Sequence, residues 1–436
     1  MEQVLNLFTR YKNPDGIVKP ISHSFVFRVL GLLLIYLSQV LLARLMGPKA
    51  YGDYTVIITI VNVLLAISLF GMDTSALRFI PSAIAKKENG AVHGFIRFSY
   101  RLITFISIIC SIGLFVFLLA NAKKFNIGFS EGLFWAVLLL PFLAFIYQAG
   151  SVLRALQQIK ISMLPVYILL PIFISAGCLY YYTSNHKLSV DAAMMINLIC
   201  TVAVCIFINK KAGRTVSQLV PEADGISRPG LWTSVSALIF ITTLLNMLLK
   251  QSDILFISYF LGNTKAGIYG AAVKISTLVA LGLSVTDYVF MPKIAALWEK
   301  RQVIRLQKLV HEGSRQILLI TIPIAIVLFA GGKLLLGFFG ESFSAAYLPL
   351  VILIIGQLVN AVTGMVGGLL TMTGNQKMFL VFYLAAFGVQ SVLNIILIPA
   401  FGILGASIAS SLGLILLNVI GYRFIKKRMK ISASAF

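Results

Sequence analysis

Two ionisable residues inside one apolar stretch are the first candidates for chemistry. Lys250 and Asp253 lie in the run 232–261, where they share one helical stripe with Thr243 and Asn246. Counting inward from the end of the run at about 1.5 Å per residue places Asp253 roughly 13 Å deep and Lys250 roughly 18 Å deep. An ionisable group at such a depth in a bilayer costs on the order of 3 kcal/mol, so each is a functional candidate. A lysine here can bind an anionic group, and a carboxylate can bind a coupling proton or cation.

A structural role is the alternative for this pair. Lys250 and Asp253 are three residues apart, so they could neutralise each other and hold neighbouring helices together. We favour a function, because well-packed apolar residues would provide a structural contact at lower cost.

The first apolar run offers a second set of polar residues. Arg28, Tyr36 and Gln39 fall on one helical face, with Arg28 near the inner end of the run. The guanidinium group of Arg28 could bind an incoming anion with two parallel hydrogen bonds, or the side chain could simply extend to the membrane surface. Arg101 and Arg154 are similar candidates at the same membrane surface.

Lys274 is a further candidate, roughly 9 Å inside the outer end of its own run. It could face a cavity or extend outward to the surface. Together the intramembrane residues are mostly basic, with Asp253 as the acidic exception, which favours an anionic ligand. We expect no metal site and no catalytic residue, because the four histidines are isolated and the four cysteines lack CxxC spacing.

Composition identifies the environment of these residues. The chain has 436 residues, of which 59% are hydrophobic and 11% charged, and its formal net charge is +22. Soluble domains carry about 25% charged residues, so an ordinary soluble domain is excluded. Apolar runs of about 20 residues separate the basic clusters, which argues against nucleic acid as a partner. We predict an all-α polytopic membrane protein embedded in a lipid bilayer.

Hydropathy predicts about twelve transmembrane helices. Their ranges are 25–45, 54–76, 98–120, 132–156, 163–183, 190–209, 232–261, 267–291, 316–338, 347–371, 378–398 and 404–425. Gly47-Pro48 and the segment 399–402 provide clear breaks between spans. The basic segment 293–315 is predicted to form an amphipathic helix on the inner membrane surface.

The basic residues also predict orientation. Alternate loops divide most of the 36 Lys and Arg residues in a ratio of roughly four to one, and the richer side is assigned to the cytoplasm. Both termini are then cytoplasmic. The predicted organisation is a cytoplasmic N-terminal segment 1–24, an N-lobe 25–209, a cytoplasmic linker 210–231, a C-lobe 232–425 and a basic cytoplasmic tail 426–436.

An internal repeat relates the two halves. The pattern G-x4-G-x-Y occurs at Gly47, Gly52 and Tyr54, and again 215 residues later from Gly262 to Tyr269. Each copy follows one apolar run and precedes the next. Two six-helix lobes related in this way are typical of transporters with a parallel repeat and a central cavity.

Several motifs resemble the Wzx-type O-antigen and polysaccharide flippases. In the first half these are Leu41-Leu42-Ala43-Arg44-Leu45-Met46-Gly47-Pro48 with Tyr51-Gly52-Asp53-Tyr54, and Leu69-Phe70-Gly71-Met72-Asp73-Thr74-Ser75 with Arg78-Phe79. In the second half they are Ser252-Asp253-Ile254, Gly267-Ile268-Tyr269-Gly270-Ala271-Ala272 with Lys274-Ile275, and Gly402-Ile403-Leu404-Gly405-Ala406-Ser407. The family belongs to the multidrug/oligosaccharidyl-lipid/polysaccharide flippase superfamily.

The resemblance implies a V-shaped fold and alternating access in the bacterial inner membrane. It implies that the substrate is an undecaprenyl-pyrophosphate-linked sugar, moved by antiport against a proton or sodium ion. It also implies work alongside the polysaccharide polymerase and chain-length machinery. In this scheme Asp253 couples the cation, and the substrate-binding residues are Arg28, Tyr36, Gln39, Arg101, Arg154, Asn246, Lys250 and Lys274.

Two other functions stay open on the sequence. One is an ion-coupled multidrug exporter of the same superfamily. The other is a membrane enzyme, a polymerase or ligase acting on lipid-linked sugars, although the predicted outer loops are short and carry only Glu131 and Glu341 as acids. We therefore expect a transporter rather than an enzyme.

Overall fold

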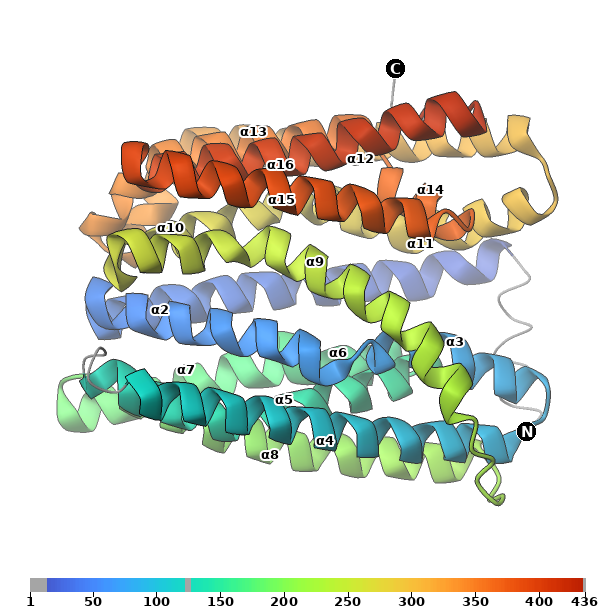
Figure 1. Ribbon diagram of the computed structural model, residues 1–436, viewed down its shortest axis with the longest axis horizontal. Coiled ribbons are helices and arrows are strands. Elements are labelled where there is room, and N and C mark those ends of the chain that lie inside the picture. The colour runs from blue at the N-terminus through green and yellow to red at the C-terminus, as the bar shows by residue number, and fades with distance from the viewer. Residues whose placement is uncertain (1–13, 122–126, 434–436) are drawn as a thin grey trace. The chain divides into compact units, whose positions relative to one another are not determined.

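A computed structural model describes residues 14–121 and 127–433, and every regular element in that part is a helix (Figure 1). Among the described residues, 11 helices are long and apolar enough to cross a membrane. The first of them, Val29–Ala85, contains two spans that meet at Gly47. These helices therefore account for the twelve predicted spans, and the chain is a multi-pass membrane protein.

The helices follow one another with short connections. Their bounds in the first half are α2 Pro14–Leu69, α3 Met72–Ala85, α4 Asn89–Asn121, α5 Ile127–Ala155, α6 Ile159–Leu164, η2 Pro165–Leu169, α7 Leu170–Asn185 and α8 Val190–Leu219. In the second half they are α9 Pro229–Leu261, α10 Asn263–Ser276, η3 Thr277–Ala280, α11 Leu281–Glu299, α12 Val303–Phe339, η4 Glu341–Ala346, α13 Tyr347–Thr363, α14 Val366–Met372, α15 Gln376–Phe401, α16 Ile403–Phe424 and η5 Ile425–Met429.

Glycines with positive φ separate several spans. Gly47 has φ 75°, Gly262 has φ 85° and Gly402 has φ 62°, a region that favours glycine over residues with a Cβ atom. The predicted breaks at Gly47 and around Gly402 are confirmed. Gly47 and Gly262 occupy equivalent places in the repeat, so each copy of the motif begins with the same backbone turn.

Three sequence predictions about helices are wrong. The predicted span 54–76 crosses a break, because α2 ends at Leu69, Gly71 has φ 70° and α3 begins at Met72. The predicted span 347–371 is broken, because α13 ends at Thr363, Gly364 has φ 73° and α14 begins at Val366. The segment 293–315 is not one amphipathic helix either, since it contains the end of α11, a turn in which Arg301 has φ 54°, and the start of α12. Alternation of basic and apolar residues occurs on both sides of this turn, so the pattern resembled a single helix.

The chain forms two compact units. Unit 1 contains Met1–Met46 and Ile57–Leu244, and unit 2 contains Gly47–Val56 and Leu245–Phe436. Each unit therefore takes a segment from the opposite half of the sequence. Unit 2 includes the repeat motif that begins at Gly47, and unit 1 includes the first half of α9.

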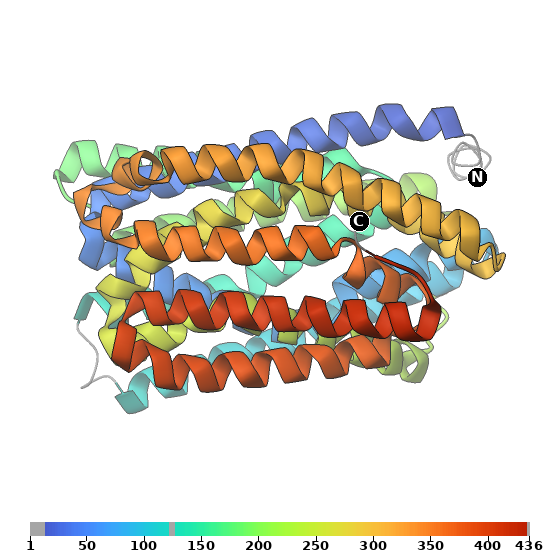
Figure 2. The same cartoon turned by 90° about the horizontal axis from the view of Figure 1, so that it is seen from above.

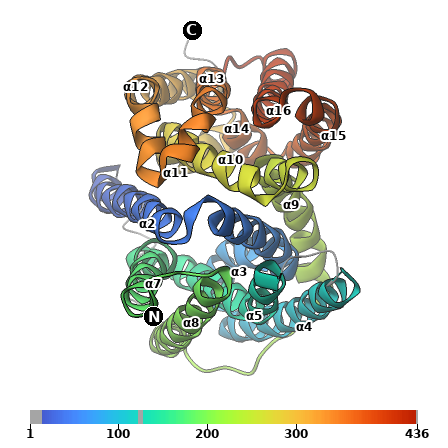
Figure 3. The same ribbon diagram turned by 90° about the vertical axis from the view of Figure 1, so that its left-hand side faces the viewer.

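Unit 1 is built around α5, which packs against α3, α4 and α8 (Figure 3). The start of α9 joins this unit through Trp232, whose ring contacts Phe95 edge to face at 5.6 Å between centroids. Further along α9, the hydroxyl oxygens of Ser236 and Ser75 are 2.6 Å apart and buried. These contacts hold the beginning of α9 against helices of the first half.

The connection between α8 and α9 is fixed along the start of α4. The Ile226 amide donates to the Gly90 carbonyl at 2.9 Å, and Arg228 forms an ion pair with Glu88 at 3.1 Å. Gly94 lies so close to the Ile226 carbonyl oxygen that a Cβ atom there would overlap it. Helix α8 also continues to Leu219, so the first half of the predicted linker 210–231 is helical.

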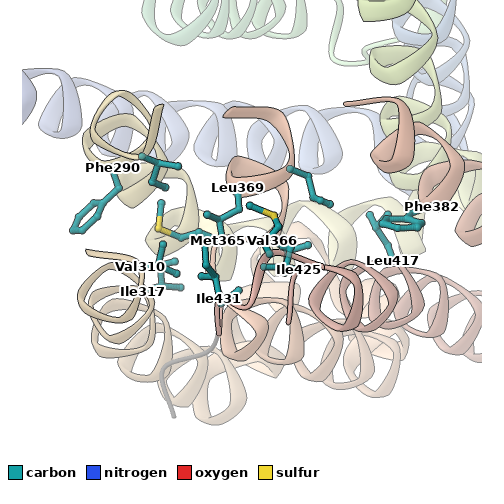
Figure 4. Close-up of a cluster of buried hydrophobic side chains, with 14 of the residues drawn as sticks. Phe290, Val310, Ile317, Met365, Val366, Leu369, Phe382, Leu417, Ile425 and Ile431 are labelled. Atoms are coloured by element: carbon teal, nitrogen blue, oxygen red, sulfur yellow. The ribbon is translucent and has the colours of Figure 1, made fainter. Parts of the chain in front are cut away.

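In unit 2, α15 packs along α16, and α13 packs against both α12 and α16. The two adjacent red helices in Figure 2 are α15 and α16. A buried apolar cluster fills one end of this unit and includes Met365 and Leu369 near the break between α13 and α14 (Figure 4).

The last described residues of the chain are part of that cluster. Ile431 and Ala433 are fully buried. The Ser314 hydroxyl donates to the Ala433 carbonyl at 2.6 Å, while Gln307 both donates to and accepts from the backbone of Ser432, at 3.0 and 2.8 Å. The Ala433 carbonyl oxygen occupies the space that a side chain on residue 364 would need, which explains why the α13–α14 break requires glycine.

Candidate functional site

Asp253 forms the centre of a buried polar cluster in unit 2. Its side chain on α9 is 1% exposed. Oδ2 accepts a hydrogen bond from the Tyr269 hydroxyl on α10 at 3.0 Å, and Oδ1 accepts from Gln390 Nε2 at 2.6 Å and Asn394 Nδ2 at 2.9 Å on α15. Ser410 of α16 also hydrogen-bonds the carboxylate. Three helices, α10, α15 and α16, thus supply the carboxylate on α9 with uncharged polar partners.

The two amide side chains are only half satisfied. Gln390 and Asn394 are fully buried, and Gln390 Nε2 also donates to the Leu249 carbonyl at 2.9 Å. Gln390 Oε1 and Asn394 Oδ1 have no hydrogen-bond partner among the described residues. A buried acceptor without a partner is costly, so such atoms need an explanation. Two amide oxygens beside a carboxylate form a set of hard oxygen atoms suited to a cation, and an amide oxygen can also accept the proton of a neutral carboxyl group.

Glycine on α16 makes room for the Gln390 amide. A Cβ atom at Gly413 would lie 2.7 Å from Gln390 Oε1 and 3.0 Å from Gln390 Cβ. A larger residue at 413 would therefore displace the amide from Asp253. The cluster depends on a specific close approach of α15 and α16.

The predicted stripe on α9 divides between two environments. Asp253 is buried, Asn246 is partly exposed and Lys250 is exposed. Because Asp253 receives its hydrogen bonds from other helices, a local pair with Lys250 is not required to satisfy the carboxylate. The exposed position of Lys250 suits contact with a mobile ligand.

Lys274 lies against Tyr51. Its ammonium nitrogen donates to the Tyr51 hydroxyl at 2.9 Å and lies 5.1 Å from the centre of the same ring. Tyr51 is fully buried and contacts Phe339 and Phe343 edge to face. Both residues belong to unit 2. A substrate-binding role for Lys274 stays a prediction.

The predicted residues of the first half lie in unit 1. Tyr36 and Gln39 on α2 are partly exposed, Arg101 on α4 is exposed, and Arg154 on α5 donates to Ser151 Oγ at 2.7 Å. Arg28 lies in α2, but its side chain is outside those that the structure describes. The role of these residues in substrate binding stays a prediction.

Unit 1 also has a cavity of about 330 Å³ between α4, α5 and α8. His93, Tyr100, Asn209 and Glu222 are its main polar lining residues. No residue predicted from sequence to bind substrate is among its lining residues. Among the described residues there is also no group of three or more His, Cys, Asp or Glu side chains that could hold a metal ion.

Comparison with known proteins identifies the family. The sequence profile described as "Polysaccharide biosynthesis protein" matches residues 41–348, which is most of the chain. The chain belongs to this polysaccharide biosynthesis protein family. No match was found among curated proteins.

Solved structures of MATE transporters share the fold. A multidrug resistance MATE family transporter of the MOP superfamily, in its inward-facing conformation, has a TM-score of 0.71 at 16% identity, covering 92% of this chain and 95% of that chain. MATE in the straight conformation gives 0.71 at 14% identity and 97% coverage of both chains. The MATE multidrug transporter DinF-BH gives 0.69 at 16% identity, covering 95% of this chain and 96% of that chain. The fold of this family member is therefore MATE-like over nearly its full length.

Sequence reasoning found Asp253 in this family member but missed its amide partners. Gln390 and Asn394 are four residues apart in an otherwise apolar span, a spacing that places both on one helical face. That spacing was the available signal, because two buried amides in a membrane helix require partners. What the sequence could not show was that their common partner is Asp253, 137 and 141 residues earlier in the chain.

Proposed function

We propose that this protein is a flippase for lipid-linked oligosaccharides. The substrate is an undecaprenyl-pyrophosphate-linked repeat unit, moved from the cytoplasmic to the periplasmic or outer leaflet of the bacterial inner membrane. Movement is coupled by alternating access to the opposite movement of a proton or sodium ion. Membership of the polysaccharide biosynthesis protein family and a MATE-like fold support this assignment together.

The coupling mechanism rests on one observation. The buried carboxylate of Asp253 lies beside two amide oxygens, of Gln390 and Asn394, that have no hydrogen-bond partner among the described residues. With the NH2 groups of Gln390 and Asn394 turned toward Asp253, the amides stabilise the negative carboxylate of a cation-free state. Rotating either amide by half a turn presents its oxygen instead, which suits a bound cation or the proton of a neutral carboxyl. The cluster thus offers donors to the negative carboxylate and acceptors to a bound cation or a neutral carboxyl group.

The basic residues provide the second part of the proposal. Lys250 and the arginines Arg28, Arg101 and Arg154 bind the pyrophosphate, while Tyr36, Gln39 and Asn246 hydrogen-bond the sugar. The polyprenyl tail stays in the lipid. Lys250 and Arg101 are not enclosed by protein, which is compatible with this division.

Complementation tests the proposal directly. Asp253→Asn keeps the size of the side chain but cannot become negatively charged. We expect it to lose surface polysaccharide in a flippase-null host at normal protein level, and Lys250→Ala to reduce it strongly. Glu341→Gln, a change at an exposed acid, is the matched control. Normal polymer in both Asp253→Asn and Lys250→Ala would refute the site.

The same strains separate the other functions. A deletion strain with normal polymer but increased drug sensitivity would identify a multidrug exporter instead. Purified protein in vesicles that moves a fluorescent lipid-linked sugar without altering it chemically would exclude a polymerase or ligase.

A further inference from the structure

Helix α10 connects the Asp253 cluster to the repeat motif of the first half. Tyr269 on this helix is fully buried and donates to Asp253 Oδ2 at 3.0 Å. The same helix carries Asn263, Gly267 and Lys274, which contact the segment Gly47–Val56 within unit 2. One short helix therefore contacts both the coupling carboxylate and the segment that unit 2 takes from the first half.

The two copies of the repeat motif pack directly against each other. A Cβ atom on Gly267 would lie 2.5 Å from Gly52 Cα and 2.9 Å from Gly52 N, and a Cβ atom on Gly52 would overlap the Asn263 carbonyl. Gly52 and Gly267 are equivalent residues of the repeat. Backbones at such close approach cannot slide past each other freely, so movement of α10 must move the segment as well.

Polar side chains fasten the two copies on either side of the glycines. Asn263 Nδ2 donates to Asp53 Oδ1 at 2.5 Å, and Lys274 Nζ donates to the Tyr51 hydroxyl at 2.9 Å. Asp53 is 5% exposed and Tyr51 is fully buried, while Asn263 and Lys274 are partly exposed, so both bonds are partly shielded from water. The segment is held at three points along about three turns of α10.

We propose that α10 transmits occupancy of the Asp253 cluster to the segment Gly47–Val56. Tyr269 and Lys274 are positioning residues in this process. The hydrogen bond from Tyr269 changes with the charge of the Asp253 carboxylate. The hydrogen bond from Lys274 to Tyr51 makes the segment Gly47–Val56 move with α10. Lys274 thereby acts through Tyr51 rather than by binding substrate. Because the polypeptide continues from Val56 directly into Ile57, the chain itself carries the displacement to unit 1. This inference rests on cation coupling at Asp253.

Transmission begins at the side chains that face the Asp253 carboxylate from the helices packed against α9. These are Tyr269 on α10, Gln390 and Asn394 on α15, and Ser410 on α16. When a cation occupies the cluster, the amides turn and the carboxylate is no longer a full acceptor for the tyrosine hydroxyl. Tyr269 is the member of this set whose helix also carries Gly267 and Lys274, so its response is the one passed on.

Hydrogen–deuterium exchange of full-length protein in nanodiscs tests the inference. Peptides covering 47–56 report the distant segment, and peptides covering 390–394 report the cluster itself. Sodium is added at constant pH, and a separate series lowers the pH without sodium, with each exchange rate divided by the intrinsic rate of an unstructured peptide at the same pH. We expect one of these to change exchange in both peptides by about fivefold, the factor that corresponds to one net hydrogen bond.

Variants then separate transmission from coupling. Lys274→Met should keep the response at 390–394 and lose it at 47–56. Tyr269→Phe, which removes a hydrogen bond to the coupling carboxylate itself, should lose the response at 47–56 whatever its effect at 390–394. Tyr259→Phe is the matched control, since Tyr259 is 83% exposed on α9, and it should behave as wild type. If Tyr269→Phe is unstable, Lys274→Met alone provides the test.

Each other outcome has a definite meaning. An unchanged response at 47–56 in both variants overturns transmission through α10, as does loss of both responses in Lys274→Met. A wild-type response at 390–394 but not at 47–56 also overturns it, while coupling at Asp253 stands. No wild-type response in either peptide refutes the coupling proposal itself.

Discussion

Because the two copies of the repeat motif pack closely, adding a single methyl group between them should lower the stability of the protein markedly. Gly267→Ala adds one methyl group whose carbon would lie 2.5 Å from Gly52 Cα. Carbon atoms prefer separations of about 3.5–4.0 Å, so the segment must retreat by roughly 1 Å. The contact is with backbone, and no side-chain rotation can relieve it. Overpacking of this kind costs about 1–3 kcal/mol.

The higher helix propensity of alanine stabilises the variant and so opposes the cost of overpacking, and the two contributions must be separated. Alanine is favoured over glycine in a helix by up to about 1 kcal/mol, so the measured change for Gly267→Ala underestimates the contact. Gly388→Ala on α15 is the matched control, because a Cβ atom there meets nothing within 4 Å. The difference between the two variants isolates a contact term of about 2 kcal/mol. For a domain of this size that corresponds to roughly 4–8 °C in melting temperature.

The assay is thermal unfolding in detergent, followed by the fraction of protein that remains monodisperse on size-exclusion chromatography. Gly267→Ala should melt well below Gly388→Ala, and Gly52→Ala should behave like Gly267→Ala because its Cβ would overlap the Asn263 carbonyl. Equal melting temperatures for Gly267→Ala and Gly388→Ala would refute the close packing of the repeat copies. Transmission through α10 would then lose its mechanical basis.

Three further predictions concern the ends of helices. Gly94→Ala should lower the melting temperature relative to Gly113→Ala, because only the first places a Cβ atom against the connection between α8 and α9; equal values would show that this connection is free. Glu88→Gln should change the free energy of unfolding by less than about 1 kcal/mol, since the ion pair with Arg228 is partly exposed. A larger loss in denaturant unfolding would contradict a minor role for this ion pair. A chain ending at Lys430 loses a fully buried isoleucine and its neighbours, so it should be destabilised by about 2–3 kcal/mol, whereas an unchanged melting curve would show that the tail is not packed.

Most of the membrane-spanning segments could be predicted from the sequence, because the mean hydropathy of a window depends only on the residues within it. A window of about 20 apolar residues can hardly be anything but a span, whatever it packs against. The glycine breaks at Gly47 and Gly402 were readable for a similar reason, since a turn between two spans needs local backbone freedom. The break at Gly364 was missed because its cause is not local: the Ala433 carbonyl occupies the position of the side chain.

The candidate site was likewise predicted only in part from the sequence. Asp253 was evident because a carboxylate inside an apolar run is costly in any fold. Its partners were decided by tertiary structure, since the identity of the helix that packs beside α9 depends on the shapes of all the helices in unit 2. The sequence likewise revealed that the motifs at Gly47 and Gly262 are copies of each other. Only the packed structure brings Gly52 and Gly267 into contact, because close approach of two backbones requires glycine on both sides at the same point in space.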